Sequence, residues 1–136
     1  MSGPFIFIAI NRLKAGKLEA ERRRVSGLCD FVEGNEPRIL AFNEYASDDG
    51  TEVGVVQLHP DAESMEFHME IVAERAARAY AETLDATTSI EVYGEPSDAV
   101  LAMLSRQAGA GVPMVVKRHH LGGFTRATPS SPPAVR

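Results

Sequence analysis

A histidine lies on the apolar stripe of a predicted amphipathic helix, residues 61–82. Along this stretch, apolar or aromatic side chains recur at three- and four-residue spacing, which places them on one face. The members of this stripe are Met65, His68, Met69, Val72, Ala76, Ala79 and Tyr80. His68 can be a base that lines a pocket, because its pKa lies near neutrality and burial tunes it. It can equally be a core side chain whose ring nitrogens bond a backbone carbonyl or a tyrosine.

An asparagine, Asn11, ends the first predicted strand. Its amide both accepts and donates hydrogen bonds, so it can orient a substrate carbonyl or a dioxygen-derived group. It can equally form a turn before Gly16, because asparagine favours such positions. On the helix, Tyr80 carries a polar tip, while Met65 and Met69 offer an adaptable apolar lining suited to flat ligands. The candidate catalytic residues are therefore His68 and Asn11, and the candidate substrate-binding residues are Tyr80, Met65 and Met69.

The remaining histidines and the single cysteine do not predict a metal site or a nucleophile. His119 and His120 are neighbours on a predicted strand, so their side chains point to opposite faces and cannot both bind one ion. Cys29 lies in an apolar helical pattern that is typical of a small buried side chain. The sequence also has no glycine-rich phosphate loop, nucleophile elbow or zincin spacing. We expect neither a metal nor a cofactor.

Composition narrows the class of protein. The 136 residues are 44% hydrophobic and carry a net charge of −5, which indicates one ordinary domain rather than a nucleic-acid binder. The dense basic run 22–24 is flanked by Glu19 and Glu21, so we expect a solvated helix face with local ion pairs. The apolar run 5–10 is too short to span a bilayer and lacks the flanks of a signal peptide. A cytoplasmic protein with no membrane or nucleic-acid partner is predicted.

Hydrophobic periodicity and turn residues divide the chain into strands and helices. Asp61 is placed to cap the second helix, and the pair Asp49-Gly50 favours a tight hairpin turn. The end of the chain is rich in proline and serine, so we predict one domain over 1–126 and a flexible tail over 127–136. The predicted strands are 5–11, 38–42, 51–58, 87–93 and 113–120, and the predicted helices are 17–34, 61–82 and 97–109.

The order of these elements predicts an α+β fold. The first six form a ferredoxin-like βαββαβ unit, and an extra C-terminal helix and strand follow it. Residues 5–10 and 53–56 are apolar at nearly every position, whereas a sheet covered on one face should alternate. Since nothing else in the chain is large enough to cover the second face, we expect a second copy to do so. The sequence therefore predicts a homodimer that forms through the sheet face.

Two phrases and the element order resemble a known family. The phrases are Ile10-Asn11-Arg12-Leu13, which closes the first strand, and His59-Pro60-Asp61-Ala62, which opens the second helix. Together they are similar to the antibiotic biosynthesis monooxygenase-like family of the dimeric α/β-barrel superfamily, over about residues 4–124. The resemblance implies two ferredoxin-like chains packed sheet against sheet, each with a pocket between its sheet and helices. Catalytic members oxygenate activated phenols or quinols without a metal or flavin, and haem-degrading relatives bind haem in this pocket.

The resemblance implies a cofactor-independent monooxygenase that acts on a small aromatic molecule such as a quinol or phenol. His68 would be its base, Asn11 its orienting amide and Tyr80 a helper. The alternative is a non-catalytic ligand-binding or structural homodimer. Haem binding is a third hypothesis, because Asn11 matches an asparagine of haem-degrading relatives, although the pocket tryptophan of those proteins has no counterpart in this chain.

Overall fold

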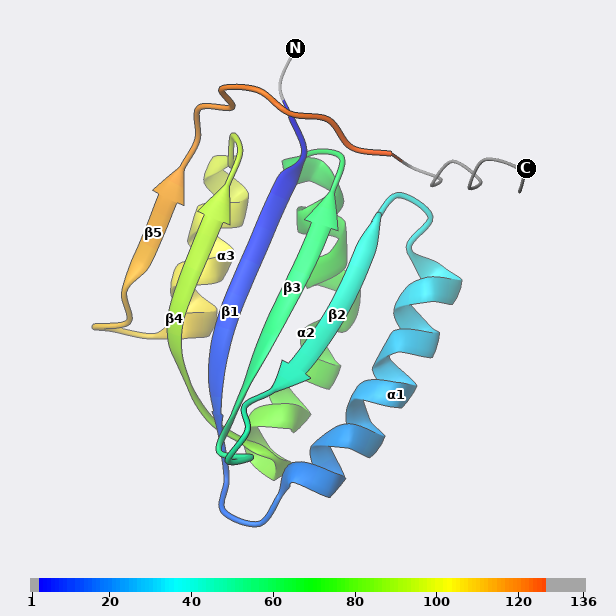
Figure 1. Ribbon diagram of the computed structural model, residues 1–136, viewed down its shortest axis with the longest axis vertical. Coiled ribbons are helices and arrows are strands. Elements are labelled where there is room, and N and C mark those ends of the chain that lie inside the picture. The colour runs from blue at the N-terminus through cyan, green and yellow to red at the C-terminus, as the bar shows by residue number, and fades with distance from the viewer. Residues whose placement is uncertain (1–2, 127–136) are drawn as a thin grey trace, which may run out of the picture.

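The computed structural model describes residues 3–126, and within them the chain forms a five-stranded sheet and three helices (Figure 1). Strand β1 lies in the middle and pairs antiparallel with β3 and β4, while β2 and β5 form the two edges. Strand β5 runs parallel to β4 because the helix α3 connects them as a crossover. The elements are β1 (Phe5–Leu13), α1 (Leu18–Asn35), β2 (Ala41–Ala46), β3 (Glu52–His59), α2 (Ala62–Glu82), β4 (Leu84–Tyr93), α3 (Asp98–Ala108) and β5 (Met114–Lys117).

This architecture confirms the predicted fold class, a ferredoxin-like βαββαβ unit with an extra C-terminal helix and strand. The predicted cap at Asp61 also forms. Asp61 accepts a hydrogen bond from the backbone N–H of Ser64 at 3.0 Å, which satisfies one of the free amides in the first turn of α2. Ser97 caps α3 in the same way through the N–H of Val100. None of the helices in residues 3–126 combines the length and the apolar composition needed to cross a membrane.

The central strand β1 has two different faces. Phe5, Phe7 and Ala9 are buried beneath α2 and α3, and they form the main core with residues of those helices. Ile6, Ile8 and Ile10 point to the opposite face and are only half-buried, since no helix of the described chain covers that face (Figure 1). The unbroken apolar run in the sequence thus supplies one covered face and one uncovered apolar face.

The predicted second strand, 38–42, is wrong in its position. Strand β2 runs from Ala41 to Ala46, so it begins later and continues to the hairpin turn. The turn decides this register: Gly50 adopts a φ of 70°, and the N–H of Ser47 bonds the carbonyl of Glu52, which places Ala46 beside β3. The polar pair 43–44 obscured the strand in the sequence, because an edge strand tolerates polar residues that a central strand excludes.

The predicted last strand, 113–120, is too long. Strand β5 ends at Lys117, opposite Tyr93, because its partner β4 ends there in a turn at Gly94. Gly94 has a φ of 105°, and a Cβ atom at this position would lie 2.7 Å from the backbone oxygen of Pro4. His119 and His120 are therefore exposed residues beyond the sheet, and they do not occupy opposite faces of a strand. The predicted tail, 127–136, lies outside the described residues.

Two other strands are longer than predicted at the end of the sheet where β1 leads into α1. Strand β1 continues beyond residue 11 to Leu13, and β4 begins at Leu84 rather than at residue 87. Their pairing there contains two irregularities in register, one between Ile10 and Asn11 and one after Arg12. The extra residues are Thr88 and Asp85 of β4, so the bulges lie in β4 and re-aim its side chains. Strand β1 alternates without a break, and Asn11 points to the helix-covered side of the sheet together with Phe5, Phe7 and Ala9.

Candidate functional site

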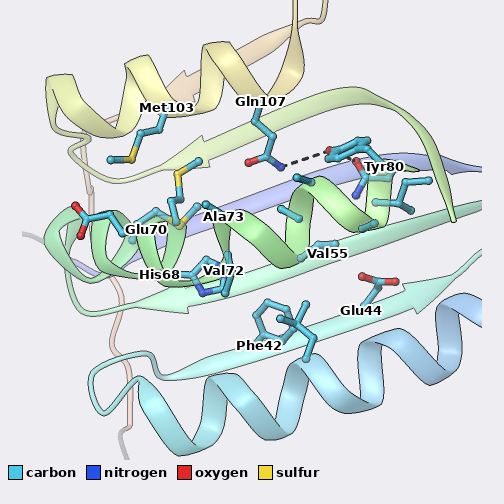
Figure 2. A pocket seen from close by; sticks show the side chains of 18 of the residues that line it. Phe42, Glu44, Val55, His68, Glu70, Val72, Ala73, Tyr80, Met103 and Gln107 are labelled. Carbon is cyan, nitrogen blue, oxygen red and sulfur yellow. Dashed lines mark hydrogen bonds between the residues drawn. The ribbon is translucent and has the colours of Figure 1, made fainter. Parts of the chain in front are cut away.

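A cavity of about 510 Å³ lies between the sheet and the helices α1, α2 and α3 (Figure 2). This volume falls within the range of small-molecule sites. Its walls are mostly apolar, and most of its polar side chains fall into three groups: His68 with Glu36 behind it, Asn11 with its hydrogen-bond partners, and Glu44 with Arg24. The charged side chains of Glu70 and Arg106 also line it. The apolar part of the lining consists of Leu28, Phe42, Val55, Met65, Met69, Val72, Ala73, Ala76, Ala77, Ala79, Leu84 and Met103.

His68 lines this cavity from α2, as its place on the apolar stripe predicts. The side chain is buried, and its Nδ1 lies 2.7 Å from Oε2 of Glu36. A carboxylate accepts hydrogen bonds, so Nδ1 carries the proton and Nε2 is left with a lone pair. Nε2 makes no hydrogen bond with any residue that the structure describes, and it is not enclosed by protein atoms. It is therefore free to take a proton from a molecule in the cavity.

Glu36 is a functional candidate that sequence reasoning missed. It lies just beyond the C-terminal end of α1, where its N–H bonds the carbonyl of Val32, and Pro37 follows it. Its side chain is 1% exposed, and the second carboxylate oxygen, Oε1, is buried without a hydrogen-bond partner among the described residues. A carboxylate so poorly solvated gains strongly from a nearby positive charge. Glu36 thus orients the ring of His68.

His59 packs beside His68 and stays neutral. The two ring centroids are 5.9 Å apart, and His59 is fully buried. The Nε2 of His59 donates to the side-chain oxygen of Gln57 at 2.9 Å, so Nδ1 accepts from the hydroxyl of Ser64 at 2.7 Å. Burial, reinforced by His68, lowers the pKa of His59 to about 3. His59 is therefore a fixed neutral support that packs against the ring of His68.

Asn11 stands at one end of a chain of hydrogen bonds. Thr87 donates to its side-chain oxygen at 2.6 Å, and the hydroxyl of Tyr80 bonds that of Thr87. Gln107 donates to Tyr80 at 3.5 Å (Figure 2). The amide nitrogen of Asn11 has no hydrogen-bond partner among the described residues and is not enclosed by protein. Because these bonds polarise one another, they strengthen Asn11 as a donor toward the cavity. Asn11 lies within β1, so it does not form the turn before Gly16.

A buried acid pair, which the sequence did not reveal, lies on the α1 side of the cavity. Arg24 bonds Glu21 through two contacts of 2.8 and 2.6 Å, and it lies 3.8 Å from Glu44. Burial, with Glu21 beside it, raises the pKa of Glu44 to about 9. Burial opposes ionisation of Glu21 too, but hydrogen bonds from Arg24, Glu44 and Thr83 lower its pKa. Glu44 is thus a protonated carboxyl that lines the cavity at neutral pH.

The expected solvated face at 22–24 is wrong for part of this run. Arg22 does pair with Glu19 on the surface, but Glu21 is only 1% exposed and Arg24 is half-buried. The spacing in the sequence predicted the local ion pair of Glu21 with Arg24, but it did not predict that Glu21 is buried. The carboxyl group of Glu44 lies on the other side of Arg24, on the edge strand β2. The predicted strand, 38–42, ended before Glu44.

The register of the sheet spaces the three polar groups along the cavity. Phe42 contacts the ring of His68 at 5.6 Å between centroids, and Glu44 follows on the same face of β2. Helix-facing positions on a strand are about 7 Å apart. Measured along the strands from Phe42, which contacts His68, Glu44 is one such step away, about 7 Å. Asn11 is two steps away, about 13 Å. The pairs that set these levels on β3 are Phe42–Gln57, Glu44–Val55 and Asn11–Val53.

The structure brings the predicted residues to one cavity but separates their roles. His68 and Asn11 line opposite ends, so the two cannot contact the same ligand atom. Tyr80 lines the cavity, and its hydroxyl bonds Thr87, which in turn bonds Asn11. Met65 and Met69 form part of the apolar wall. His119 and His120 are not part of the lining.

Neither Cys29 nor a metal-binding cluster adds to the polar groups of the cavity within residues 3–126. Burial, with the acidic neighbours Glu44, Asp30 and Glu33, raises the pKa of the half-buried Cys29 thiol, as befits a packing side chain rather than a nucleophile. Within residues 3–126, no three histidine, cysteine, aspartate or glutamate side chains come together in a way that could hold a metal ion.

The fold and site place the chain among ferredoxin-like α+β proteins whose helices enclose a ligand-sized cavity on one side of the sheet. Solved structures share this fold. MupZ from Pseudomonas fluorescens superposes with a TM-score of 0.69 at 18% identity, over 93% of this chain and 91% of that one. Antibiotic biosynthesis monooxygenase superposes with a TM-score of 0.56 at 15% identity, over 65% and 94%. Rv0793 from Mycobacterium tuberculosis gives a TM-score of 0.58 at 16% identity, over 71% and 99%.

These neighbours confirm the fold that the resemblance predicted, that of the antibiotic biosynthesis monooxygenase-like α/β-barrel structures. At identities of 15–18% they show the fold alone. No protein-family model matches the sequence, and no curated protein sequence matches it.

Proposed function

We propose that this protein is a cofactor-independent monooxygenase that acts on a small aromatic substrate of the phenol or quinol type. The observation that carries the proposal is the free Nε2 of His68, which faces an apolar cavity while Glu36 holds the other ring nitrogen. A base with a buried carboxylate behind it is suited to removing a proton from a substrate hydroxyl. The apolar walls suit a flat ring, and they exclude the water that would otherwise solvate the resulting anion.

The substrate anion then supplies the electrons for oxygenation. His68 takes the proton of the phenolic O–H, and the electron-rich phenolate passes one electron to dioxygen. The resulting radical pair joins at a ring carbon, and the proton held by His68 completes a hydroperoxide. Loss of water from the hydroperoxide leaves a ring carbonyl, so that one phenol and one dioxygen yield one quinone and one water. The protein needs to supply a base and oriented donors, while the substrate supplies the reducing electrons.

The other polar groups of the proposal serve to orient the substrate. Asn11 donates from its amide to an oxygen at the far end of the ligand, with Tyr80 and Thr87 fixing the direction of that amide. Met65 and Met69 adapt to the ring faces. Because about 13 Å separates the levels of Asn11 and His68 along the sheet, a single ring held by His68 does not reach Asn11. Asn11 would therefore bind an oxygen on a second ring or a substituent of the substrate.

We further propose that two chains associate through the uncovered face of the sheet. Ile6, Ile8 and Ile10 of β1 lie on that face beside Val56 and Leu58 of β3, and all five are half-buried in the single chain. A contiguous apolar surface of this kind is typical of a protein–protein interface. Sheet-to-sheet packing would bury it without disturbing the cavity, which lies on the opposite side of the sheet.

Dioxygen consumption with a panel of phenols and quinols tests the activity. We expect wild-type protein to consume oxygen, and His68→Ala to lower kcat by at least about 100-fold, because a positioned base contributes roughly 10²–10⁴-fold. Glu36→Gln should lower kcat by about 10-fold, because a neutral amide replaces the carboxylate that accepts the hydrogen bond of His68. His119→Ala, an exposed histidine outside the cavity, is the matched control and should retain wild-type activity.

Equal oxygen consumption by wild type and His68→Ala would contradict the assignment of the base. Absence of consumption by wild type across the panel would contradict the proposed activity. If wild type then still bound a quinol saturably, as measured by calorimetry, the cavity would have a binding role without catalysis.

A further inference from the structure

The cavity contains a second proton-transfer group besides His68, and it is a carboxyl. Resting on the function proposed above, we propose that Glu44 is the general acid that protonates the leaving hydroxide when the hydroperoxide loses water. His68 and Glu44 line the same cavity from α2 and β2, and Phe42 packs beside His68 (Figure 2). The separation of about 7 Å along β2 leaves room for one small ring between the base and the acid.

Charge balance around Glu44 gives the first argument. Glu21 and Glu44 lie against each other in the protein interior, with side chains 2% and 5% exposed, and one guanidinium, that of Arg24, faces both. Two ionised carboxylates beside one cation would leave an uncompensated buried charge, which is strongly unfavourable. The cluster therefore holds one proton, in agreement with the raised pKa of Glu44.

The hydrogen bonds decide which carboxyl group carries that proton. Glu21 receives both close contacts of Arg24 and a third bond from the hydroxyl of Thr83 at 2.6 Å, so Glu21 is the ionised partner. Glu44 lies 3.8 Å from Arg24 and faces the cavity, so Glu44 is the protonated one. Its pKa of about 9 agrees with this assignment. Once Glu44 has given up its proton, Arg24 is near enough to stabilise the carboxylate.

The other titratable groups that face Glu44 do not supply this proton. On α1, the Cys29 thiol is the remaining neighbour besides Glu21 and Arg24, and its raised pKa makes it a poor acid. On α2, His68 is committed as the base, and Tyr80 bonds Thr87 in the Asn11 network. Strand β3 presents the apolar Val55 at the level of Glu44.

The proposed step is balanced in atoms and electrons. His68 removes the proton from the ring carbon that carries the hydroperoxide, and the C–H electron pair becomes the second bond of the new carbonyl. The O–O bond breaks, its electron pair leaves with the outer oxygen as hydroxide, and Glu44 protonates that hydroxide to water. The step leaves a protonated His68 and an ionised Glu44. Transfer of the proton from His68 to Glu44 through solvent restores both groups.

The test compares Glu44→Gln with wild type in the oxygen-consumption assay. Glutamine keeps the shape and can still donate to Glu21, but it cannot give up a proton, so we expect KM to change less than about 3-fold and kcat to fall by roughly 10²-fold or more. In wild type, kcat should fall as pH rises through about 9, and this alkaline limb should disappear in Glu44→Gln. Glu74→Gln, an exposed carboxylate of α2 outside the cavity lining, is the matched control and should keep the wild-type profile.

Infrared spectroscopy provides a readout that does not depend on turnover. Wild type at pH 7 should show a carboxylic-acid carbonyl band that is absent in Glu44→Gln and present in Glu74→Gln. A missing band in wild type would overturn the inference. So would an active wild type whose kcat and alkaline limb are unchanged in Glu44→Gln, and that result would leave the proposed function standing. An inactive wild type would instead overturn the proposed function, and with it the role of Glu44.

Discussion

His59 should make the protein sensitive to acid. Its ring is fully buried, and both of its nitrogens are engaged with neutral partners, Gln57 and Ser64. Protonation would turn the nitrogen that accepts from Ser64 into a donor, and it would place a charge 5.9 Å from the ring of His68. The folded state therefore resists protonation of His59, whose pKa falls from the ordinary 6.5 to about 3.

The magnitude follows from the difference between the folded and unfolded states. As pH falls below 6.5, the unfolded chain binds a proton at His59 that the folded protein does not bind until about pH 3. The unfolded state then holds more protons, so the free energy of unfolding decreases through this window, by about 1.4 kcal/mol per pH unit. From pH 7 to pH 4.5 the contribution of His59 is about 3 kcal/mol, against a total stability of roughly 5–15 kcal/mol for a small domain.

The assay isolates His59 by comparison with a replacement that cannot titrate. Urea unfolding, followed by circular dichroism at pH 7 and pH 4.5, is measured for wild type and for His59→Asn. The variant is expected to be less stable at pH 7, because asparagine fills the site poorly, but to lose about 3 kcal/mol less than wild type on acidification. The carboxyl groups titrate in both proteins and cancel in the difference.

An equal loss of stability in wild type and His59→Asn would refute the reasoning. That result would mean that the folded protein protonates His59 at an ordinary pKa, which requires water to reach the ring. The neutral support behind His68 would then be absent, and the orientation of the proposed base would depend on Glu36 alone.

Two other predictions concern the fold and the assembly. Asp61→Ala removes the carboxylate that accepts from Ser64 and should lower the free energy of unfolding by about 1 kcal/mol, measured by thermal or urea unfolding; an unchanged stability would contradict the capping role. Ile8→Glu places a charge at the centre of the uncovered sheet face and should convert a dimer to a folded monomer in light scattering. Ser26→Glu, exposed on α1, should leave the dimer intact, and a monomeric wild type would rule out the proposed interface.

Local sequence signals predicted the architecture well, because they depend on neighbours in the chain. The apolar run of β1, the Asp49-Gly50 turn and the cap at Asp61 each act within a few residues, and together they define the ferredoxin-like order. The same periodicity placed His68 on the sheet-facing stripe of α2. The errors fall at β2 and β5, two edge strands whose limits depend on the strands they pair with rather than on their own composition.

The partners of the candidate site came only from tertiary structure. Glu36 meets His68 across 32 positions of the chain, Thr87 meets Asn11 across 76, and Thr83 meets Glu21 across 62. No spacing rule covers such distances, because they are set by how α1 and β4 pack around α2 and β1. The sequence by itself determined the fold class and the direction in which His68 points. Packing decided that an open cavity lies there, that a buried carboxylate backs the histidine, and that a second carboxyl group retains its proton, since burial and charge depend on what surrounds each group in space.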